Sequence, residues 1–182
     1  MLITAIDPGP EESAFVVYDT TFHTPHQRGI VGNDNMRRRI QNYNLLTVIE
    51  MIGCYGMPVG KDIFDTCVWI GRFVECSTCN FSLIYRKDVK LYLCNSARAK
   101  DSNIRQVLID RYGGSKASAI GNKKIGEGPL YGFKKDMWSA LAVAVYFSDH
   151  LEENKEKPTM QQRVHANFEA VRAGKKRREL VL

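Results

Sequence analysis

A chain of 182 residues, 44% of them hydrophobic and 25% charged, has the composition of one soluble globular domain. It contains no apolar run of the roughly 20 residues that a membrane-spanning helix requires, and its first residues carry no basic leader, so we expect a cytoplasmic protein rather than a membrane or secreted one. The net charge of +6 is uneven: residues 1–85 sum to −3 and residues 86–135 to +8. This distribution favours a polyanionic partner such as nucleic acid.

The first third of the sequence predicts most of a β-sheet. The expected elements are strands over 1–9, 12–21 and 26–33, a short helix over 33–44 and a buried strand over 45–53. The first two strands would form a hairpin, because "MLITAIDPG" ends in an Asp-Pro-Gly turn signal. Asn33 or Asp34 would cap the helix.

The rest of the sequence alternates helix and strand. The expected elements are a helix over 62–76, a strand within 81–94, a helix over 101–113, a long loop over 113–135 and an apolar helix from Asp136 to about Glu153. A hairpin-led meander followed by alternating elements predicts the mixed α/β class, with helices covering the sheet. We assign one domain to residues 1–154 and a basic tail, helical or disordered, to residues 155–182.

The five cysteines do not form a disulfide framework, because their number is odd and their spacing irregular. Cys76 and Cys79 have the spacing of half a structural zinc site, but such a site needs about four ligands. We therefore expect no zinc and predict reduced thiols in a reducing compartment.

Three acidic residues stand where carboxylates are rare. Asp7 ends a strand that should lie inside the sheet, Glu50 lies among apolar neighbours in "LTVIEMI", and Asp136 leads the apolar helix. A buried ionised carboxylate needs a partner because its desolvation is costly, so a group of such acids favours a bound cation. Asp136 alone is also explained as a cap on the positive end of the helix dipole.

Carboxylate oxygens suit Mg²⁺, with Mn²⁺ as a possible substitute. Two such ions about 3.5–4 Å apart can activate a water and stabilise the leaving oxygen when a phosphodiester is cleaved in line. The basic middle segment would then hold the nucleic-acid backbone that the acids cut. The residues therefore favour metal-dependent phosphoryl transfer.

The three acid-bearing motifs resemble a known enzyme family. "AIDPG", the lone Glu in "TVIEMI" and the Asp before "SALAVAV" look like the RuvC Holliday-junction resolvases of the RNase H superfold, over roughly residues 1–150. "LCNSARAKDSNIRQVLIDRYG" and "GPLYG…DMWSALAVAV" are most similar to the short resolvase-like proteins of bacteriophages. The resemblance implies an RNase H-like five-stranded sheet led by an antiparallel three-strand meander. It also implies a phage or prophage gene acting in a bacterial host, in DNA recombination and repair.

The resemblance implies a metal-dependent, structure-selective endodeoxyribonuclease that cuts branched DNA and leaves 5′-phosphate and 3′-hydroxyl ends. Asp7 would bridge two ions, while Glu50 and Asp136 would hold one each. It also implies a homodimer, since a four-way junction needs two symmetric nicks. The helix around Phe64, Val68 and Trp69 is the candidate interface, although simple packing on the sheet explains each of these residues equally well.

One position departs from the family pattern. RuvC enzymes usually carry a second metal-side residue three positions after the helix acid, on the same face, and here that position is Ser139 rather than an acid. Either Ser139 contributes through water, or another acid such as Asp19 or Asp101 helps, or the second ion binds only with DNA.

The sequence also suggests how DNA is held. The predicted DNA-binding residues are Lys100, Arg105, Lys123, Lys124, Lys134 and Lys135, with Tyr55 as a stacking candidate. Arg105 stands four residues after Asp101, so these two side chains would alternatively pair with each other.

Other functions remain open on the sequence. A non-catalytic branched-DNA-binding module would have the same fold and basic face, and a ribonuclease H-type enzyme would act on RNA–DNA hybrids. A nucleotide phosphotransferase of the actin and sugar-kinase type also has a first strand that ends in an Asp-Gly turn, but such chains are about twice as long.

Overall fold

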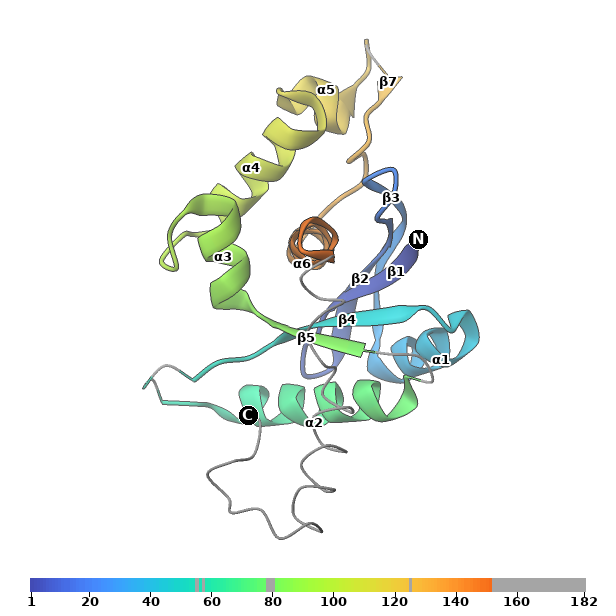
Figure 1. Ribbon diagram of the computed structural model, residues 1–182, viewed down its shortest axis with the longest axis vertical. Helices are drawn as coiled ribbons and strands as arrows, with labels where there is room; N and C mark the ends of the chain where they lie inside the picture. The colour runs from blue at the N-terminus through green and yellow to red at the C-terminus, as the bar shows by residue number, and fades with distance from the viewer. Residues whose placement is uncertain (55, 57, 78–80, 125, 152–182) are drawn as a thin grey trace, which may run out of the picture.

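The computed structural model describes residues 1–54, 56, 58–77, 81–124 and 126–151, and these form a five-stranded sheet with helices on both faces (Figure 1). The strands are β1 (Leu2–Asp7), β2 (Glu12–Asp19), β3 (Thr24–Gly32), β4 (Leu46–Met51) and β5 (Phe81–Tyr85). Their order is β3-β2-β1-β4-β5; the β3-β2-β1 meander is antiparallel, whereas β4 and β5 run parallel to β1. This confirms the predicted mixed α/β sheet.

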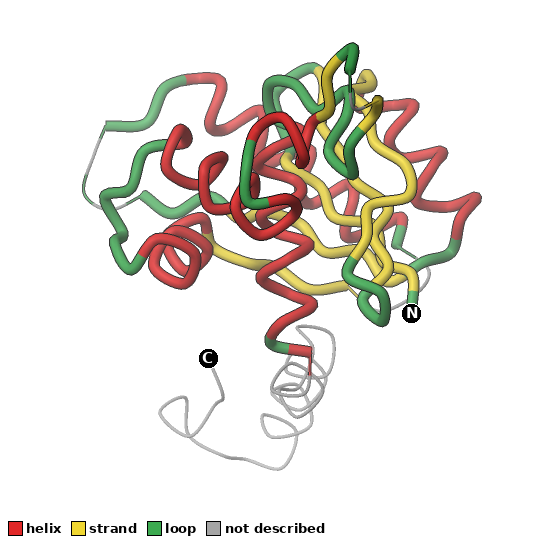
Figure 2. Tube along the Cα trace, turned by 90° about the horizontal axis from the view of Figure 1, so that it is seen from above, coloured by secondary structure: helices red, strands yellow, loops and turns green. Residues whose placement is uncertain are grey.

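Two layers of helices cover the sheet. The helices are α1 (Asn33–Tyr43), α2 (Lys61–Cys76), α3 (Arg86–Cys94), α4 (Asp101–Gly113), α5 (Lys116–Ile120) and α6 (Met137–Asp149), and a small hairpin pairs β6 (Gly121–Asn122) with β7 (Gly126–Glu127). Helix α6 lies on one face and α1 and α2 on the other (Figure 1). In the perpendicular view α6 crosses in front of the strands (Figure 2). Because α6 packs on β1 and β2 and is covered by α3 and α4, it is apolar on nearly all sides.

The alternation of side chains along the strands divides the core into two. Ile3, Ala5 and Val48 belong to the cluster on the α6 face, whereas Ile6 and Ile49 belong to the cluster around α1 and α2. Successive side chains on a strand point to opposite faces. This periodicity decides where the acids at the strand ends point.

One sequence prediction was incomplete and one was wrong in detail. The predicted strand within 81–94 is β5, and the sequence analysis did not assign the helix α3 that follows it, in which Val89 and the partly buried Leu93 recur at helical spacing and pack on the α6-face core. The expected loop over 113–135 contains the short helix α5 and the β6-β7 hairpin.

The described helices include none that is long and apolar enough to cross a membrane. Tyr55, Cys79 and the predicted tail over 155–182 lie outside the described residues.

Candidate functional site

Asp7 and Glu50 lie side by side at the carboxyl edge of the sheet. Ile6 pairs with Ile49 in the parallel β1-β4 ladder, so the next residue on each strand, Asp7 or Glu50, falls in the same register. Each stands two residues after a side chain of the α6-face core, and both therefore face α6. Glu50 is only 6% exposed and Asp7 is half-buried. The sheet therefore places two desolvated carboxylates about one strand spacing apart, roughly 5 Å.

The turn after Asp7 is fastened to α1. The side chain of Asn33 donates to the carbonyl of Gly9 at 2.9 Å and accepts from the Ser13 hydroxyl at 2.6 Å. A Cβ on Gly9 would lie 2.5 Å from the Glu12 carbonyl oxygen, so only glycine fits this turn. The predicted cap on α1 is thus wrong for both Asn33 and Asp34, because Gly32 precedes the helix with no side-chain cap, and the Asn33 side chain instead holds the turn that ends β1.

The first turn of α6 brings Asp136 and Ser139 to the same edge. Lys135 has a left-handed φ of 46°, and the Asp136 carbonyl then accepts from the Ala140 amide at 3.0 Å to open the helix. The Asp136 side chain makes no capping hydrogen bond, so it does not serve as the side-chain cap that the sequence allowed. Instead the Asp136 charge acts on Asp7, and the Ser139 hydroxyl hydrogen-bonds the Asp7 carboxylate. Glu50, Asp136 and Ser139, from two different elements, thus all act on Asp7.

Arg86, which the sequence analysis did not single out, links these residues. Its Nη1 donates to Glu50 Oε1 at 2.8 Å and to the Ser139 hydroxyl at 3.3 Å, and its Nη2 donates to Asp101 Oδ1 at 2.6 Å. Arg86 is the first residue of α3, directly after β5, and β5 is the parallel neighbour of β4. A basic residue that follows an apolar strand ending at the same edge was the available sequence signal.

Burial and mutual repulsion dominate the electrostatics of the acids. Desolvation first, then the negative charges of Glu50 and Asp136, hold the pKa of Asp7 well above its usual range against the opposing influence of Arg86. Desolvation likewise raises the pKa of Glu50, although Arg86 opposes it. Burial alone would lower the pKa of Arg86, but Glu50, Asp101 and Asp7 together raise it. The carboxylates therefore lack positive charge even with the guanidinium present.

This deficit of positive charge bears on whether the acids could bind a metal ion. As the side chains stand, no group of three carboxylates, imidazoles or thiols among the described residues encloses a metal position. The donors nevertheless fit a hard divalent cation, because Asp7, Glu50 and Asp136 offer carboxylate oxygens, and burial disfavours the ionised forms of Asp7 and Glu50 when no cation is present. A divalent ion beside Asp7 would relieve the repulsion that raises its pKa.

Asp19 and Asp101, the two other acids that the sequence suggested as possible contributors to the metal site, lie in different parts of the structure. Asp19 pairs with Leu2 at the opposite end of β1, five residues along β2 from the partner of Asp7, which corresponds to roughly 17 Å. Asp101 begins α4 and reaches the site through Arg86. Of the two, only Asp101 is near the acids.

The predicted DNA-binding residues fall into three places. A groove of about 520 Å³ brings Arg105, Lys134 and Lys135 together with Asp136 and Ser139, between the first turns of α4 and α6. Arg105 lies 4.8 Å from the ring centre of Trp138 rather than on Asp101, so the alternative ion pair between Arg105 and Asp101 was wrong.

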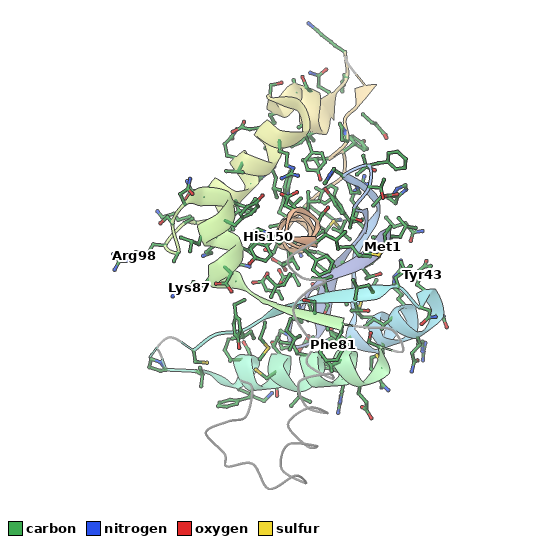
Figure 3. The ribbon with its side chains drawn as sticks, viewed as in Figure 1. Met1, Tyr43, Phe81, Lys87, Arg98 and His150 are labelled. Atoms are coloured by element: carbon green, nitrogen blue, oxygen red, sulfur yellow. The ribbon has the colours of Figure 1, made fainter. Side chains whose placement is uncertain are left out.

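The remaining lysines lie apart from this groove. Lys100 lines a second hollow of about 660 Å³ with Arg98, beside α4. Arg98 and Lys87 project from the α3 flank (Figure 3). Lys123 and Lys124 are exposed at the β6-β7 hairpin, beyond α5.

No protein-family model and no curated protein sequence matches the chain. Solved structures do match its fold. A structure of Thermus thermophilus RuvC superposes with a TM-score of 0.58 at 13% sequence identity, over 85% of this chain and 97% of that one. T. thermophilus RuvC in complex with a Holliday junction substrate gives a TM-score of 0.56 at 11% identity, over 85% and 96%. The chain therefore has a RuvC-like fold of the RNase H type.

Proposed function

We propose that this chain, with its RuvC-like fold, is a divalent-metal-dependent endonuclease that cuts branched DNA, Holliday junctions included. The observation that carries the proposal is the convergence of Asp7, Glu50 and Asp136 at one sheet edge, where desolvation and repulsion raise the pKa of Asp7. A structural role would favour acids paired one-to-one with bases, whereas Glu50 and Asp7 share the charge of one guanidinium. A match to a RuvC structure with a bound junction adds support at the level of the fold.

The residues divide the work by position. Asp7, on which the charges of both other acids act, would hold Mg²⁺ or Mn²⁺ together with Glu50 and Asp136. When bound, such ions would lower the pKa of a water and neutralise charge on the leaving O3′, so that breaking the P–O3′ bond would leave 5′-phosphate and 3′-hydroxyl ends. The Ser139 hydroxyl, whose interaction with Asp7 lowers the pKa of that carboxyl, would help to orient it. Glu50 is buried within the sheet, whereas Asp136 is exposed. The carboxylate oxygens of Glu50 are therefore held in place, and those of Asp136 can adjust to a bound ion.

The groove beside Asp136 supplies a path for a DNA strand. Arg105, Lys134 and Lys135 provide positive charge along it, and the first turns of both α4 and α6 line it. Helix N-termini favour anions, because their free amides and dipoles are positive. A phosphate in this groove would lie next to the acids. Lys100, Lys123 and Lys124 would contact more distant phosphates of a branched substrate.

Helix α2 carries an exposed apolar stripe. Phe64 is 59% exposed and Val68 54% exposed, one turn apart, and Trp69 is only partly buried. Packing on the sheet therefore does not explain Phe64 and Val68, since Ile70 and Phe73 make that contact. We propose that the exposed stripe is the dimer face, which would bring two acid sites to one junction.

A cleavage panel tests the function. Wild type, Asp7→Asn and Asp136→Asn are incubated with a four-way junction, a flap, a linear duplex and an RNA–DNA hybrid, each with Mg²⁺ or Mn²⁺. We expect the wild type to nick the junction and both variants to lose at least about 1000-fold in rate. Asp34→Asn, an exposed acid on α1, is the matched control and should cut normally.

Each other outcome identifies a competing function. Binding of the junction without nicking in either metal would favour a non-catalytic DNA-binding module, consistent with Ser139 in place of an acid. Preferential cleavage of the hybrid would favour a ribonuclease H-type enzyme. Full activity of Asp7→Asn on the junction would remove the acids from the mechanism.

A further inference from the structure

Arg86 lies between two carboxylates of very different burial. The Glu50 side chain is 7% exposed and the Asp101 side chain 73% exposed, and the guanidinium bonds both at once, through Nη1 and Nη2. Lys90 Nζ lies 4.0 Å from the same Asp101 oxygen. One anchor is thus fixed inside the sheet, while the other is a surface side chain that can move with the guanidinium.

The guanidinium also occupies the side of the cluster that a cation would use. Its Nη1 lies within hydrogen-bond distance of both Glu50 and Ser139, and its charge acts on Asp7. Two positive charges so close to one buried carboxylate repel strongly, because water screens them poorly there. A divalent ion on Glu50 and the Arg86–Glu50 hydrogen bond therefore oppose each other.

We propose that Arg86 is a built-in counter-ion that competes with a divalent cation for Glu50, and that Asp101 is the anchor to which the guanidinium retreats when the cation enters. Arg86 acts through Glu50 and is thus a positioning residue. The inference rests on the proposed function only in taking a divalent cation as the competitor. It explains why three acids converge without enclosing a metal position in the described residues: the Glu50 side already holds a cation.

The two partners of Arg86 lead to opposite predictions. Removing the guanidinium frees Glu50, so metal affinity should rise. Neutralising Asp101 removes the retreat position and leaves the guanidinium on Glu50, so affinity should fall. An ion pair that merely tethers α4 to α3 would give the same direction for both changes, since either substitution breaks it.

The test is Mn²⁺ binding to the full chain without DNA, followed by electron paramagnetic resonance of the free ion. We expect Arg86→Met to bind Mn²⁺ at least about tenfold more tightly than wild type, and Asp101→Asn to bind it several-fold more weakly. The double variant should bind Mn²⁺ far more like Arg86→Met than like Asp101→Asn, because Asp101 acts mainly through the guanidinium, although its charge also acts on Glu50. Arg38→Met, which removes an exposed arginine of α1, controls for net charge and should match wild type. If Arg86→Met fails to fold by circular dichroism, Arg86→Gln keeps a donor to Glu50 without the charge and takes its place.

The remaining outcomes are decisive as well. Unchanged or weaker Mn²⁺ binding in the folded Arg86 variant would overturn the competition. A double variant that binds Mn²⁺ as weakly as Asp101→Asn would make Asp101 a metal ligand instead of an anchor, and would also overturn the proposal. If no variant binds Mn²⁺ at all, the proposed metal-dependent function fails and this inference fails with it, whereas the first two results leave that function intact.

Discussion

The guanidinium of Arg86 donates a hydrogen bond of 2.8 Å to the buried carboxylate of Glu50. This contact joins the end of β4 to the start of α3, two elements separated by the whole of α2. Because of this contact, the acid cluster already contains the positive charge of the Arg86 side chain.

Asp7→Asn should stabilise the metal-free protein. A carboxylate whose pKa is raised by folding is destabilising when ionised, so its unfavourable contribution is complete above the folded-state pKa and disappears as the pH falls below the unfolded value of about 4. We expect the melting temperature at pH 7.5 to rise by about 2–4 °C, which corresponds to roughly 1 kcal/mol. The gain should shrink steadily toward pH 4. Differential scanning calorimetry in the presence of a chelator measures both.

Ser139→Asp should make the site more dependent on metal. The new carboxylate would lie against Asp7 and add repulsion in place of a hydrogen bond. We expect a melting temperature a few degrees below wild type in chelator, and a larger rise on addition of Mn²⁺. Ser139→Ala is the matched control, since it removes the hydrogen bond without adding charge. An equal Mn²⁺ response in all three proteins would show that position 139 does not face the ion.

Asp149→Asn should destabilise the fold at neutral pH. Asp149, 13% exposed at the end of α6, accepts from Arg111 at 2.5 and 2.7 Å and from the Tyr92 hydroxyl at 2.8 Å. Burial alone would raise the pKa of Asp149, but the Arg111 and Tyr92 hydrogen bonds lower it overall. The stabilisation is therefore present above the unfolded pKa of about 4 and is lost as the pH falls through the lower folded value.

We expect Asp149→Asn to lower the free energy of unfolding by about 2 kcal/mol at pH 7, measured by urea denaturation. The difference in the free energy of unfolding between the variant and the wild type should be constant between about pH 6 and 8 and should become smaller below about pH 4. Asp34→Asn is the control, with an exposed pair to Arg37 that should contribute little. A difference that widens in acid would contradict the assignment.

Lys134→Ala combined with Lys135→Ala should weaken junction binding and make the affinity less sensitive to salt concentration. If both lysines contact phosphates, the slope of log affinity against log salt should fall by about 2. Fluorescence anisotropy in Ca²⁺ at several salt concentrations measures this. Lys61→Ala combined with Arg38→Ala, on the opposite helical layer, removes the same charge and should leave the slope nearly unchanged.

Phe64→Glu combined with Val68→Glu should convert a dimer into a monomer. Charges in an apolar interface are left unpaired and desolvated, which opposes association. Sedimentation velocity compares wild type with this variant and with Leu91→Glu, a control at an exposed apolar residue of α3. A monomeric wild type, or a dimer that tolerates both glutamates, would exclude α2 as the interface.

The local sequence was sufficient for the elements that have strong periodicity and for the acids within them. The strand runs around Asp7 and Glu50 and the apolar helix after Asp136 are each readable alone, because apolar side chains surround one costly charge. The order of these motifs predicted the mixed sheet led by an antiparallel meander, which the structure confirms.

Only the tertiary structure shows which of these residues contact one another. Asp19 and Asp101 were equivalent candidates in the sequence, but β2 carries Asp19 to the far edge of the sheet while Arg86 draws Asp101 to the acids. Helix α3 was hidden because a short apolar run fits a strand as well as a helix until its packing against α6 is known. The Arg86–Glu50 contact depends on the parallel pairing of β4 and β5, which places residues about 35 positions apart in the sequence next to each other. No local sequence pattern encodes such a pairing. The sequence determined which residues are chemically unusual; the strand pairing determined which of them meet.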